Sequence, residues 1–393
     1  MKQKLRRLGK WEYTWLCLLV LVTLVLHFAI IANPAEPVFD EQYYIEDARD
    51  IISGDAELRA EHPPLGELLV ALGILIFGDN PFGWRTIAIV FGTISIFLLY
   101  LICRRLNLSQ KTSFLAVFLL AVENQSFNQA SVAMLDVYSV TFTLAAFWLY
   151  LRGNYAFSGV AICLSTLAKL SGALTLPAIA LHWLITRRDR RVNFIASMAL
   201  APLLFIVLIP LCDLPIVGHL ANPLLRIKTI LTMSGSVTLS YASHPYATRP
   251  WEWLIIPGIM PYWYVPHYTA AISFTLWALI IPIVIYMAYR AWKGDSAGWF
   301  VIAWFASTYL VWIPLALITD RITYVYYFYP TVGAICIGVG LVLSRLTDLW
   351  KKRLTGKLRW AAISAVLLYL LLHVAIFAVL SPMTTWWTFP IPP

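Results

Sequence analysis

The chain has 393 residues, of which 60% are hydrophobic and only 12% are charged, and its mean hydropathy is +0.75. Soluble domains do not have this composition, so it excludes a soluble globular protein and indicates an integral membrane protein. We interpret the net charge of +9 as a result of membrane topology and not of nucleic-acid binding, because of where the basic residues fall.

Eleven apolar stretches are candidates for membrane-spanning helices, which need about 20 residues. In chain order they are 14–31, 85–103, 112–122, 131–151, 155–168, 172–186, 193–212, 269–291, 298–318, 324–345 and 358–381. Residues 1–10 are basic like the start of a signal peptide, but Ile31-Ala32-Asn33-Pro34 is a poor cleavage site, so we expect a retained first helix. The sequence therefore predicts an all-α polytopic membrane protein with about eleven transmembrane helices in a single membrane domain, 1–393.

The basic residues predict the orientation. With the N-terminus in the cytoplasm, 21 of the 29 Lys and Arg residues fall in inner segments and 8 in outer ones, in agreement with the positive-inside rule. The apolar stretch 65–77 is short and holds Glu67, and a crossing there would move the basic clusters at 187–191 and 351–353 outside. We expect it to be re-entrant or interfacial. The two long outer loops are then 33–84 and 213–268.

Acidic residues gather on the same outer side, where sixteen of the 20 lie in loops or at helix ends. No glycine-rich phosphate loop and no Asp-x-Asp pair marks a nucleotide site on the cytoplasmic face. An enzyme of this kind would work on the extracytoplasmic face. Its activated substrate would most simply arrive within the membrane, as a lipid-linked compound.

The pair Asp40-Glu41 follows the first apolar stretch by a few residues. Carboxylates are costly at such a position, so the pair is a candidate catalytic site. The alternative is that Asp40 is only the N-cap of a short helix, 41–52, which Gly54 ends. Adjacent helical residues point about 100° apart, so we do not expect both carboxylates to act on one proton.

Four basic residues on the outer side are candidates for binding a lipid phosphate: Arg85, Lys169, Arg249 and Arg321. Arginine binds phosphate in a bidentate way and lysine as a point charge. The alternatives are snorkelling to the interface, or pairing with Asp136 or Asp320. Asp136 starts a span near the outer face, where it could cap the helix, balance a cation or contact substrate.

The outer histidines give a weaker signal. His62 precedes a Pro-Pro turn and either contacts substrate or fixes that turn. His244 and Tyr246 share a segment with Arg249 and are further candidate contacts. No close ligand spacing supports a metal site, so we predict no cofactor, although a divalent ion with outer histidines and carboxylates stays open. The clusters Trp251-Glu252-Trp253 and Pro261-Tyr262-Trp263-Tyr264 are most simply interfacial anchors, although aromatic faces also stack on sugars.

Several motifs together resemble the protein O-mannosyltransferase family, membrane glycosyltransferases of the C superfamily. They are Phe39-Asp40-Glu41, Glu61-His62-Pro63-Pro64-Leu65-Gly66, Gly78-Asp79-Asn80-Pro81-Phe82-Gly83-Trp84-Arg85, Met134-Leu135-Asp136, Lys169-Leu170-Ser171-Gly172 and Ser243-His244-Pro245-Tyr246-Ala247-Thr248-Arg249-Pro250-Trp251. The resemblance runs from about residue 35 to 335. The last motif, with the turn that ends at Arg85, is its most specific part.

The resemblance implies transfer of mannose from a polyprenyl or dolichyl phosphate to a Ser or Thr hydroxyl, with inversion. It maps the family's acidic pair onto Asp40-Glu41 and its second-span arginine onto Arg85. The sequence departs from the family pattern in two ways. It lacks the soluble insert that eukaryotic members carry between the seventh and eighth spans, and it has Glu67 where members often have Lys. The first of these suggests a prokaryotic enzyme.

The chemistry can also be argued without the family. We expect Asp40 to be the general base and Glu41 to orient the acceptor or to replace Asp40. Arg85, Lys169 and Arg249 would bind the donor phosphate and stabilise its growing charge. The partners would be a lipid-linked sugar donor, membrane lipid, and a protein or glycolipid acceptor. Alternatives are the same donor chemistry with a lipid A-type acceptor, as in aminoarabinose transferases, and a lipid-sugar transporter.

Overall fold

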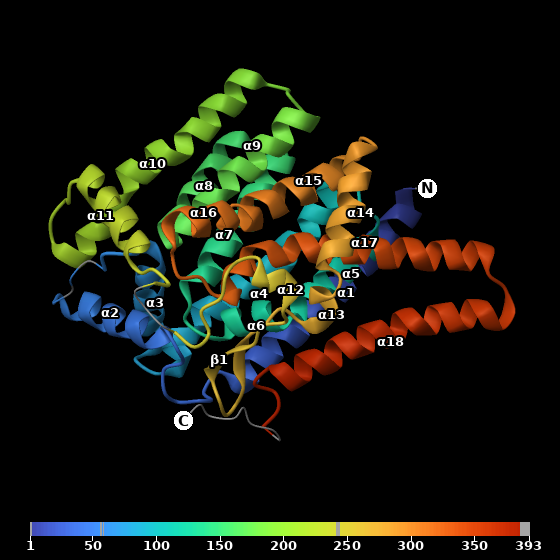
Figure 1. The fold of residues 1–393 in the computed structure, drawn as a ribbon, viewed down its shortest axis with the longest axis horizontal. Coiled ribbons are helices and arrows are strands. Elements are labelled where there is room, and N and C mark those ends of the chain that lie inside the picture. The colour runs from blue at the N-terminus through green and yellow to red at the C-terminus, as the bar shows by residue number, and fades with distance from the viewer. Residues whose placement is uncertain (1, 56, 58, 241–243, 386–393) are drawn as a thin grey trace.

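The computed structural model describes residues 2–55, 57, 59–240 and 244–385 (Figure 1), with side chains from Tyr13 onward. It is a bundle of helices with one small two-stranded sheet, which confirms the predicted all-α membrane fold. The helices that overlap the predicted spans include α1 (Lys2–Ile30), α4 (Pro81–Arg105), α5 (Gln110–Ala121), α7 (Leu135–Leu151), α8 (Tyr155–Ala168), α9 (Thr175–Thr186), α10 (Arg191–Val217), α14 (Ile280–Trp292), α15 (Ser296–Phe305), α16 (Trp312–Thr319), α17 (Tyr329–Arg353) and α18 (Gly356–Leu380).

Six helices among the described residues are long and apolar enough to cross a membrane, or seven if one bent pair is a single span. A helix overlaps each of the eleven predicted ranges, but several are short, so the number eleven remains a prediction. The range 269–291 is wrong in its first part. There β2 (Tyr268–Ala270) and the one-turn helix α13 (Phe274–Trp277) precede α14, because Thr269 and Ser273 bond to a buried polar helix.

The segment 33–84, which the sequence predicts to be the first outer loop, contains two helices before α4 among its described residues. Helix α2 (Glu41–Ser53) ends at Gly54, whose φ of 85° lies in the left-handed region that glycine tolerates. Helix α3 (Leu65–Phe77) has the predicted bounds and folds back on α4. A Cβ on Gly73 would lie 2.2 Å from the carbonyl oxygen of Gly83. The backbones of α3 and α4 can approach this closely because residue 73 is glycine, and a Cβ on Gly83 would itself lie 1.9 Å from the carbonyl oxygen of Gly78.

A break between α6 (Asn124–Ser131) and α7 gives the bundle a polar centre. The two helices meet at 115°, so the predicted span 131–151 begins only at Leu135. Every residue of α6 is buried, although most are polar. Glu123 caps the helix by accepting the N–H of Ser126, and its second oxygen accepts the N–H of Ser273.

The second outer loop contains α11 (Pro223–Ser236), α12 (Glu252–Ile255) and the strand β1 (Met260–Trp263). β1 pairs antiparallel with β2, with an irregularity between Pro261 and Trp263. The short helices η1 (Leu170–Leu174), η2 (Ala306–Leu310) and η3 (Val325–Phe328) complete the chain. An isolated bridge joins Thr238 to Arg321. This loop is thereby tied to the segment that enters α17.

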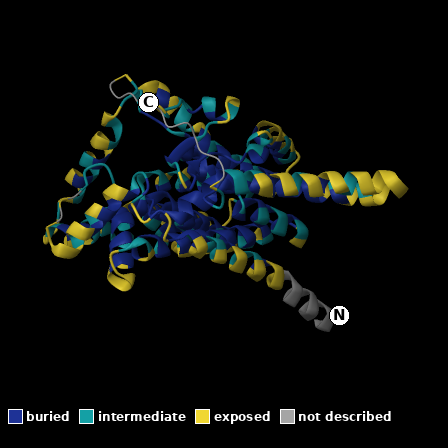
Figure 2. Ribbon diagram, turned by 90° about the horizontal axis from the view of Figure 1, so that it is seen from below, coloured by how far each residue is buried: buried dark blue, intermediate teal, exposed yellow. Residues whose placement is uncertain are grey.

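Burial separates the core from the lipid-facing surface. Figure 2 shows buried residues at the centre and exposed ones along the projecting helices. On α18 the apolar residues Leu367, Leu368 and Leu371 are exposed, as expected for helices that face lipid. In Figure 1 the N-terminus and the α17–α18 turn lie at the right, whereas α2 and α11 lie at the left.

Candidate active site

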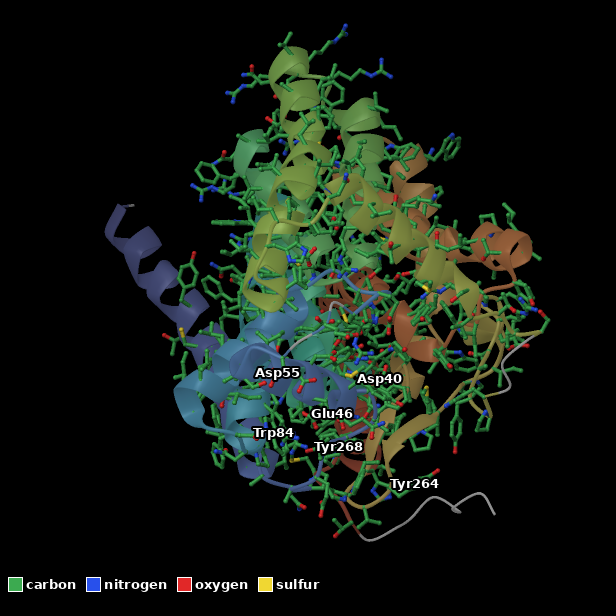
Figure 3. All side chains as sticks on the ribbon, turned by 90° about the vertical axis from the view of Figure 1, so that its left-hand side faces the viewer. Asp40, Glu46, Asp55, Trp84, Tyr264 and Tyr268 are labelled. Carbon is green, nitrogen blue, oxygen red and sulfur yellow. The ribbon has the colours of Figure 1, made fainter. Side chains whose placement is uncertain are left out.

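Asp40 immediately precedes α2, but its side chain does not cap the helix. The alternative that Asp40 is only an N-cap therefore finds no support. The residue before it, Phe39, has a φ of 53°. This left-handed conformation is unfavourable for an aromatic residue and is found mostly where the surroundings enforce it, often at functional sites. Figure 3 views the molecule from the side of α2, with Asp40 and Asp55 at the two ends of that helix.

Glu41, in contrast, is fully buried and fully bonded. Its carboxylate accepts the backbone N–H of Val38 at 2.8 Å and of Ala133 at 2.9 Å. It also forms an ion pair with Arg85 at 2.8 Å, and both side chains are 0% exposed. These contacts join the first outer loop to the α6–α7 break and to α4. Glu41 therefore has no free position for a substrate.

Arg85 uses all of its N–H groups within the protein. Nε donates to Glu41, Nη1 to the carbonyl oxygens of Ile31 and Pro34, and Nη2 to Glu41 and to the carbonyl oxygen of Glu36. A guanidinium has five N–H donors, and these contacts occupy all five. The predictions that Arg85 binds the donor phosphate and that Glu41 shares the chemistry do not fit this geometry. The pair holds the loop in place.

Lys169 and Asp136 come together beside Asp40. Lys169 Nζ lies 2.6 Å from Asp136 Oδ2, and the two side chains are 14% and 4% exposed. The ammonium group also lies 5.5 Å and 5.7 Å from the ring centres of Tyr326 and Tyr327, within cation–π range. The predicted pairing of Lys169 with Asp136 is therefore present, and tyrosine faces surround the lysine.

An aromatic cluster flanks Asp40. Phe39 stacks on Tyr262 with ring centres 4.7 Å apart and an angle of 5° between the planes. Tyr326 meets both rings edge-on at 6.1 Å. Sequence reasoning treated Tyr262 as an interfacial anchor and did not single out Tyr326. The aromatic run Pro261-Tyr262-Trp263-Tyr264 was the signal, but only the fold shows which ring turns inward.

Loss of hydration within the protein raises the pKa of Asp40 to about 6. Burial is the largest cause, and the Asp136 carboxylate adds to it, while Lys169 acts in the opposite direction. A carboxyl group with a pKa close to the working pH is well suited to act as a general base.

Several cations act electrostatically on His62. Burial and then the charges of Lys169, Arg59, Arg321 and Arg226 lower the pKa of His62 to about 3, so its ring is neutral. Arg321 donates through Nη1 to the carbonyl oxygen of Ser234, but its Nε is buried with no hydrogen-bond partner among the described residues. Two of these cations, Arg59 and Arg226, were not singled out from the sequence.

Arg249 forms an ion pair with Asp320, the pairing that the sequence offered as the alternative to phosphate binding. Its guanidinium pairs with Asp320 at 2.6 Å, and the two side chains are 30% and 36% exposed. His244 packs edge-on against Tyr324 at 5.2 Å, and the backbone N–H of Tyr246 donates to the His244 ring. The structure thus gives Arg249 a partner at the surface. A different set of predicted residues is linked by the Lys169–Asp136 ion pair and by charge effects on two pKa values: Asp40, His62, Asp136, Lys169 and Arg321.

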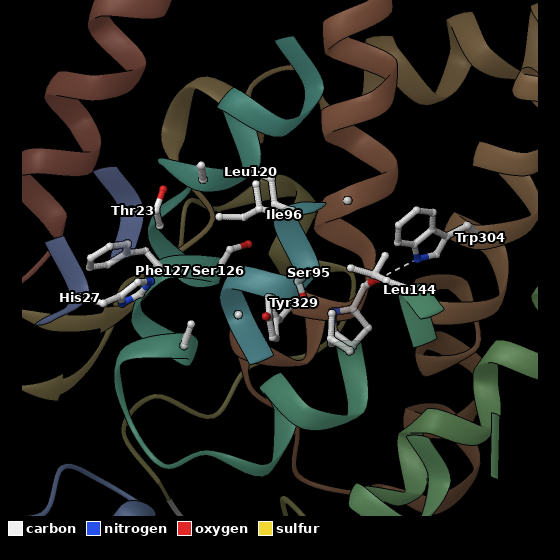
Figure 4. Close-up of a pocket in the computed structure, with 16 residues that line it drawn as sticks. Thr23, His27, Ser95, Ile96, Leu120, Ser126, Phe127, Leu144, Trp304 and Tyr329 are labelled. Atoms are coloured by element: carbon white, nitrogen blue, oxygen red, sulfur yellow. Dashed lines mark hydrogen bonds between the residues drawn. The ribbon is translucent and has the colours of Figure 1, made fainter. Parts of the chain in front are cut away.

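Two further features of the structure bear on ligand binding. An internal cavity lies between α1, α4, α6 and α17, and contains none of the predicted site residues (Figure 4). Its lining includes Thr23, His27, Ser95 and Ser126. Within the described residues, no group of three or more His, Cys, Asp or Glu side chains is arranged to hold a metal ion.

Comparisons with known proteins agree with one another. A family model described as dolichyl-phosphate-mannose-protein mannosyltransferase matches residues 61–214. A polyprenol-phosphate-mannose–protein mannosyltransferase from Corynebacterium glutamicum is 24% identical over 94% of this chain and 89% of the relative.

Solved structures share the fold. The S. cerevisiae protein O-mannosyltransferase Pmt1-Pmt2 complex bound to the sugar donor aligns with a TM-score of 0.76 at 11% identity, covering 95% of this chain and 90% of that one. ArnT from Cupriavidus metallidurans bound to undecaprenyl phosphate aligns with a TM-score of 0.64 at 16% identity, covering 93% and 76%.

Proposed function

We propose that the chain is a protein O-mannosyltransferase, as its similarity to that family model over residues 61–214 and to the Corynebacterium relative supports, and that it transfers a mannosyl or related sugar from a polyprenyl phosphate to a Ser or Thr hydroxyl of a protein, with inversion. The observation that carries the proposal is the contrast within the acidic pair. Glu41 is bonded on all sides, while Asp40 makes no cap and lies half-buried, within reach of the charge of Lys169.

In the proposed reaction Asp40 is the general base. The acceptor hydroxyl oxygen attacks the anomeric carbon and forms the new C–O bond. Its proton passes to the Asp40 carboxylate, while the bond between the sugar and the phosphate oxygen breaks. The polyprenyl phosphate leaves with that electron pair. A base on one face of the sugar and a leaving group on the other give inversion at the anomeric carbon.

The leaving phosphate would be bound by Lys169 and Arg321, with His62 beside them. Lys169 is a partly buried point charge, and the unpartnered Nε of Arg321 is a donor that is still free. Donors fixed in a water-poor site stabilise growing negative charge well. This assignment replaces the sequence-based set of Arg85, Lys169 and Arg249, and it requires no cofactor to neutralise the phosphate.

The protein is a multi-pass integral membrane protein. We further propose that its N-terminus is cytoplasmic and that the site faces the extracytoplasmic side of a prokaryotic plasma membrane. The distribution of Lys and Arg supports this orientation. The substrate would then enter from the outer leaflet.

A second candidate acceptor is a glycolipid of the lipid A type. The fold shared with ArnT bound to undecaprenyl phosphate favours it as the alternative. Both reactions would use the same base and the same phosphate site, so only the acceptor distinguishes them. The transporter alternative predicts no glycosylated product at all.

The test is a transfer assay with the purified protein in lipid. It combines polyprenyl-phosphate mannose with either a Ser/Thr-rich peptide or lipid A, and the products are weighed by mass spectrometry. We expect mannosylated peptide from the wild type. Asp40→Asn should lower kcat by about 10²- to 10⁴-fold, the range for loss of a general base. Asp55→Asn, an exposed residue beyond the other end of α2, is the matched control with normal turnover.

The outcomes separate the possibilities. Mass added to lipid A but not to the peptide would support the glycolipid alternative. Turnover by Asp40→Asn equal to that of Asp55→Asn would remove Asp40 from the chemistry.

A further inference from the structure

Helix α6 is polar and yet completely buried. Six of its eight residues are Asn, Gln or Ser, and burying such groups without hydrogen bonds is costly, above all within a membrane protein. Its apolar residue Phe127, with Ser126, lines the internal cavity next to His27 (Figure 4). The buried amide side chains of this helix therefore need hydrogen-bond partners within the protein.

Most of these amides bond to the backbone of the outer segments. Asn124 and Asn128 donate to the carbonyl oxygen of Thr269 at 3.1 Å and 2.7 Å. Gln125 donates to the carbonyl oxygen of Val325 at 3.1 Å. These bonds fix β2 and the start of η3 against the core.

Gln129 differs because, among the described residues, its amide donates to a side chain and to no backbone carbonyl. Its Nε2 lies 2.7 Å from the hydroxyl oxygen of Tyr262. Tyr262 stacks on Phe39, the residue before Asp40, and meets Tyr326 edge-on. One amide at the polar centre thus holds the ring that supports the strained turn at Asp40.

The direction of this hydrogen bond matters. Because Gln129 Nε2 donates, the Tyr262 oxygen accepts and its own O–H proton is left to donate to another group. Burial, and then the carboxylates of Asp136 and Asp40, hold the pKa of Tyr262 well above its usual range, so the hydroxyl stays protonated. A fixed neutral donor near Asp40 is suited to a sugar or acceptor oxygen.

We infer that Gln129 is a positioning residue that aims the Tyr262 hydroxyl at the sugar or the acceptor beside Asp40. The inference rests on the proposed function, because it needs sugar transfer at Asp40. It does not depend on which acceptor is used. It assigns a role in the reaction to α6, a segment that carries none of the motifs of the acidic or basic site.

The experiment is a double-mutant cycle in the transfer assay, with Gln129→Met, Tyr262→Phe and the double variant. Both changes conserve volume and remove the same hydrogen bond. We expect each single variant to lower kcat about tenfold, as for the loss of one hydrogen bond to a reacting group, with the donor KM unchanged. The double variant should be no slower than the slower single variant, because the two residues act as one unit.

Asn128→Leu is the matched control, since it removes an amide of the same helix that bonds to backbone. It should lower thermal stability and leave kcat within about twofold, and its effect should multiply with that of Tyr262→Phe. The inference is overturned if the losses in Gln129→Met and Tyr262→Phe also multiply, or if only stability changes. Absence of transfer by the wild type would instead contradict the proposed function, and the role of Gln129 with it.

Discussion

Two neighbouring acid–base regions of this protein are built in opposite ways. In the first, Glu41 and Arg85 are completely buried, and their hydrogen-bonding groups are satisfied by each other and by backbone. In the second, the Asp40 carboxylate makes no cap hydrogen bond and forms no ion pair with any described residue, and Lys169 pairs with Asp136, with exposures of 14% and 4%. The comparison shows that two adjacent acids in one motif can have different roles. Glu41 fixes the loop, whereas the Asp40 carboxylate is available to react.

The largest expected effect comes from breaking the first region. Arg85→Met would leave the Glu41 carboxylate buried without its ion partner, which typically costs about 3–5 kcal/mol. We expect a large loss of thermal stability in detergent, and partial recovery when Glu41→Gln is added. Arg249→Met, which removes a half-exposed pair, should change stability little. A normal unfolding temperature for Arg85→Met would show that the pair is not an anchor.

A smaller effect is expected from the phosphate site in the second region. Arg321→Gln should raise the KM for polyprenyl-phosphate mannose about tenfold, because it removes a donor that is not fully used within the protein. Arg249→Gln is the control and should leave the donor KM unchanged. The reverse result, with Arg249→Gln impaired and Arg321→Gln normal, would restore the assignment made from the sequence.

The smallest effect is the pH dependence of the wild type. Since Asp40 must be ionised to accept a proton, and its pKa is raised to about 6, kcat/KM should rise with pH and reach half of its plateau near pH 6. The same shift means that the charged form is less favourable in the folded than in the unfolded protein. Asp40→Asn should therefore keep or raise the unfolding temperature at neutral pH.

The direction of the change in unfolding temperature therefore distinguishes the two regions. Loss of Asp40 should remove activity without loss of stability, whereas loss of Arg85 should remove stability first. A pH profile that is flat from pH 5 to 8 would contradict a titrating base with this pKa.

The local features were readable from the chain because they depend on neighbours in sequence. The membrane class follows from composition, and the helix that Gly54 ends and the bounds of α3 follow from local pattern. The first part of the span predicted at 269–291 is not a long helix, because buried hydrogen bonds that Thr269 and Ser273 form with Asn124 and Glu123, about 150 residues away, override its apolar character.

The sequence by itself determined which residues are chemically able to act: an acidic pair, several cations and aromatic segments near the ends of apolar helices. Only the tertiary structure decided which of them are already bonded. Arg85 carries the same guanidinium as Arg321, but its N–H groups are used by Glu41 and by backbone carbonyls, and Arg249 is paired with Asp320. A side chain's availability depends on partners brought close by folding, and no spacing along the chain records them.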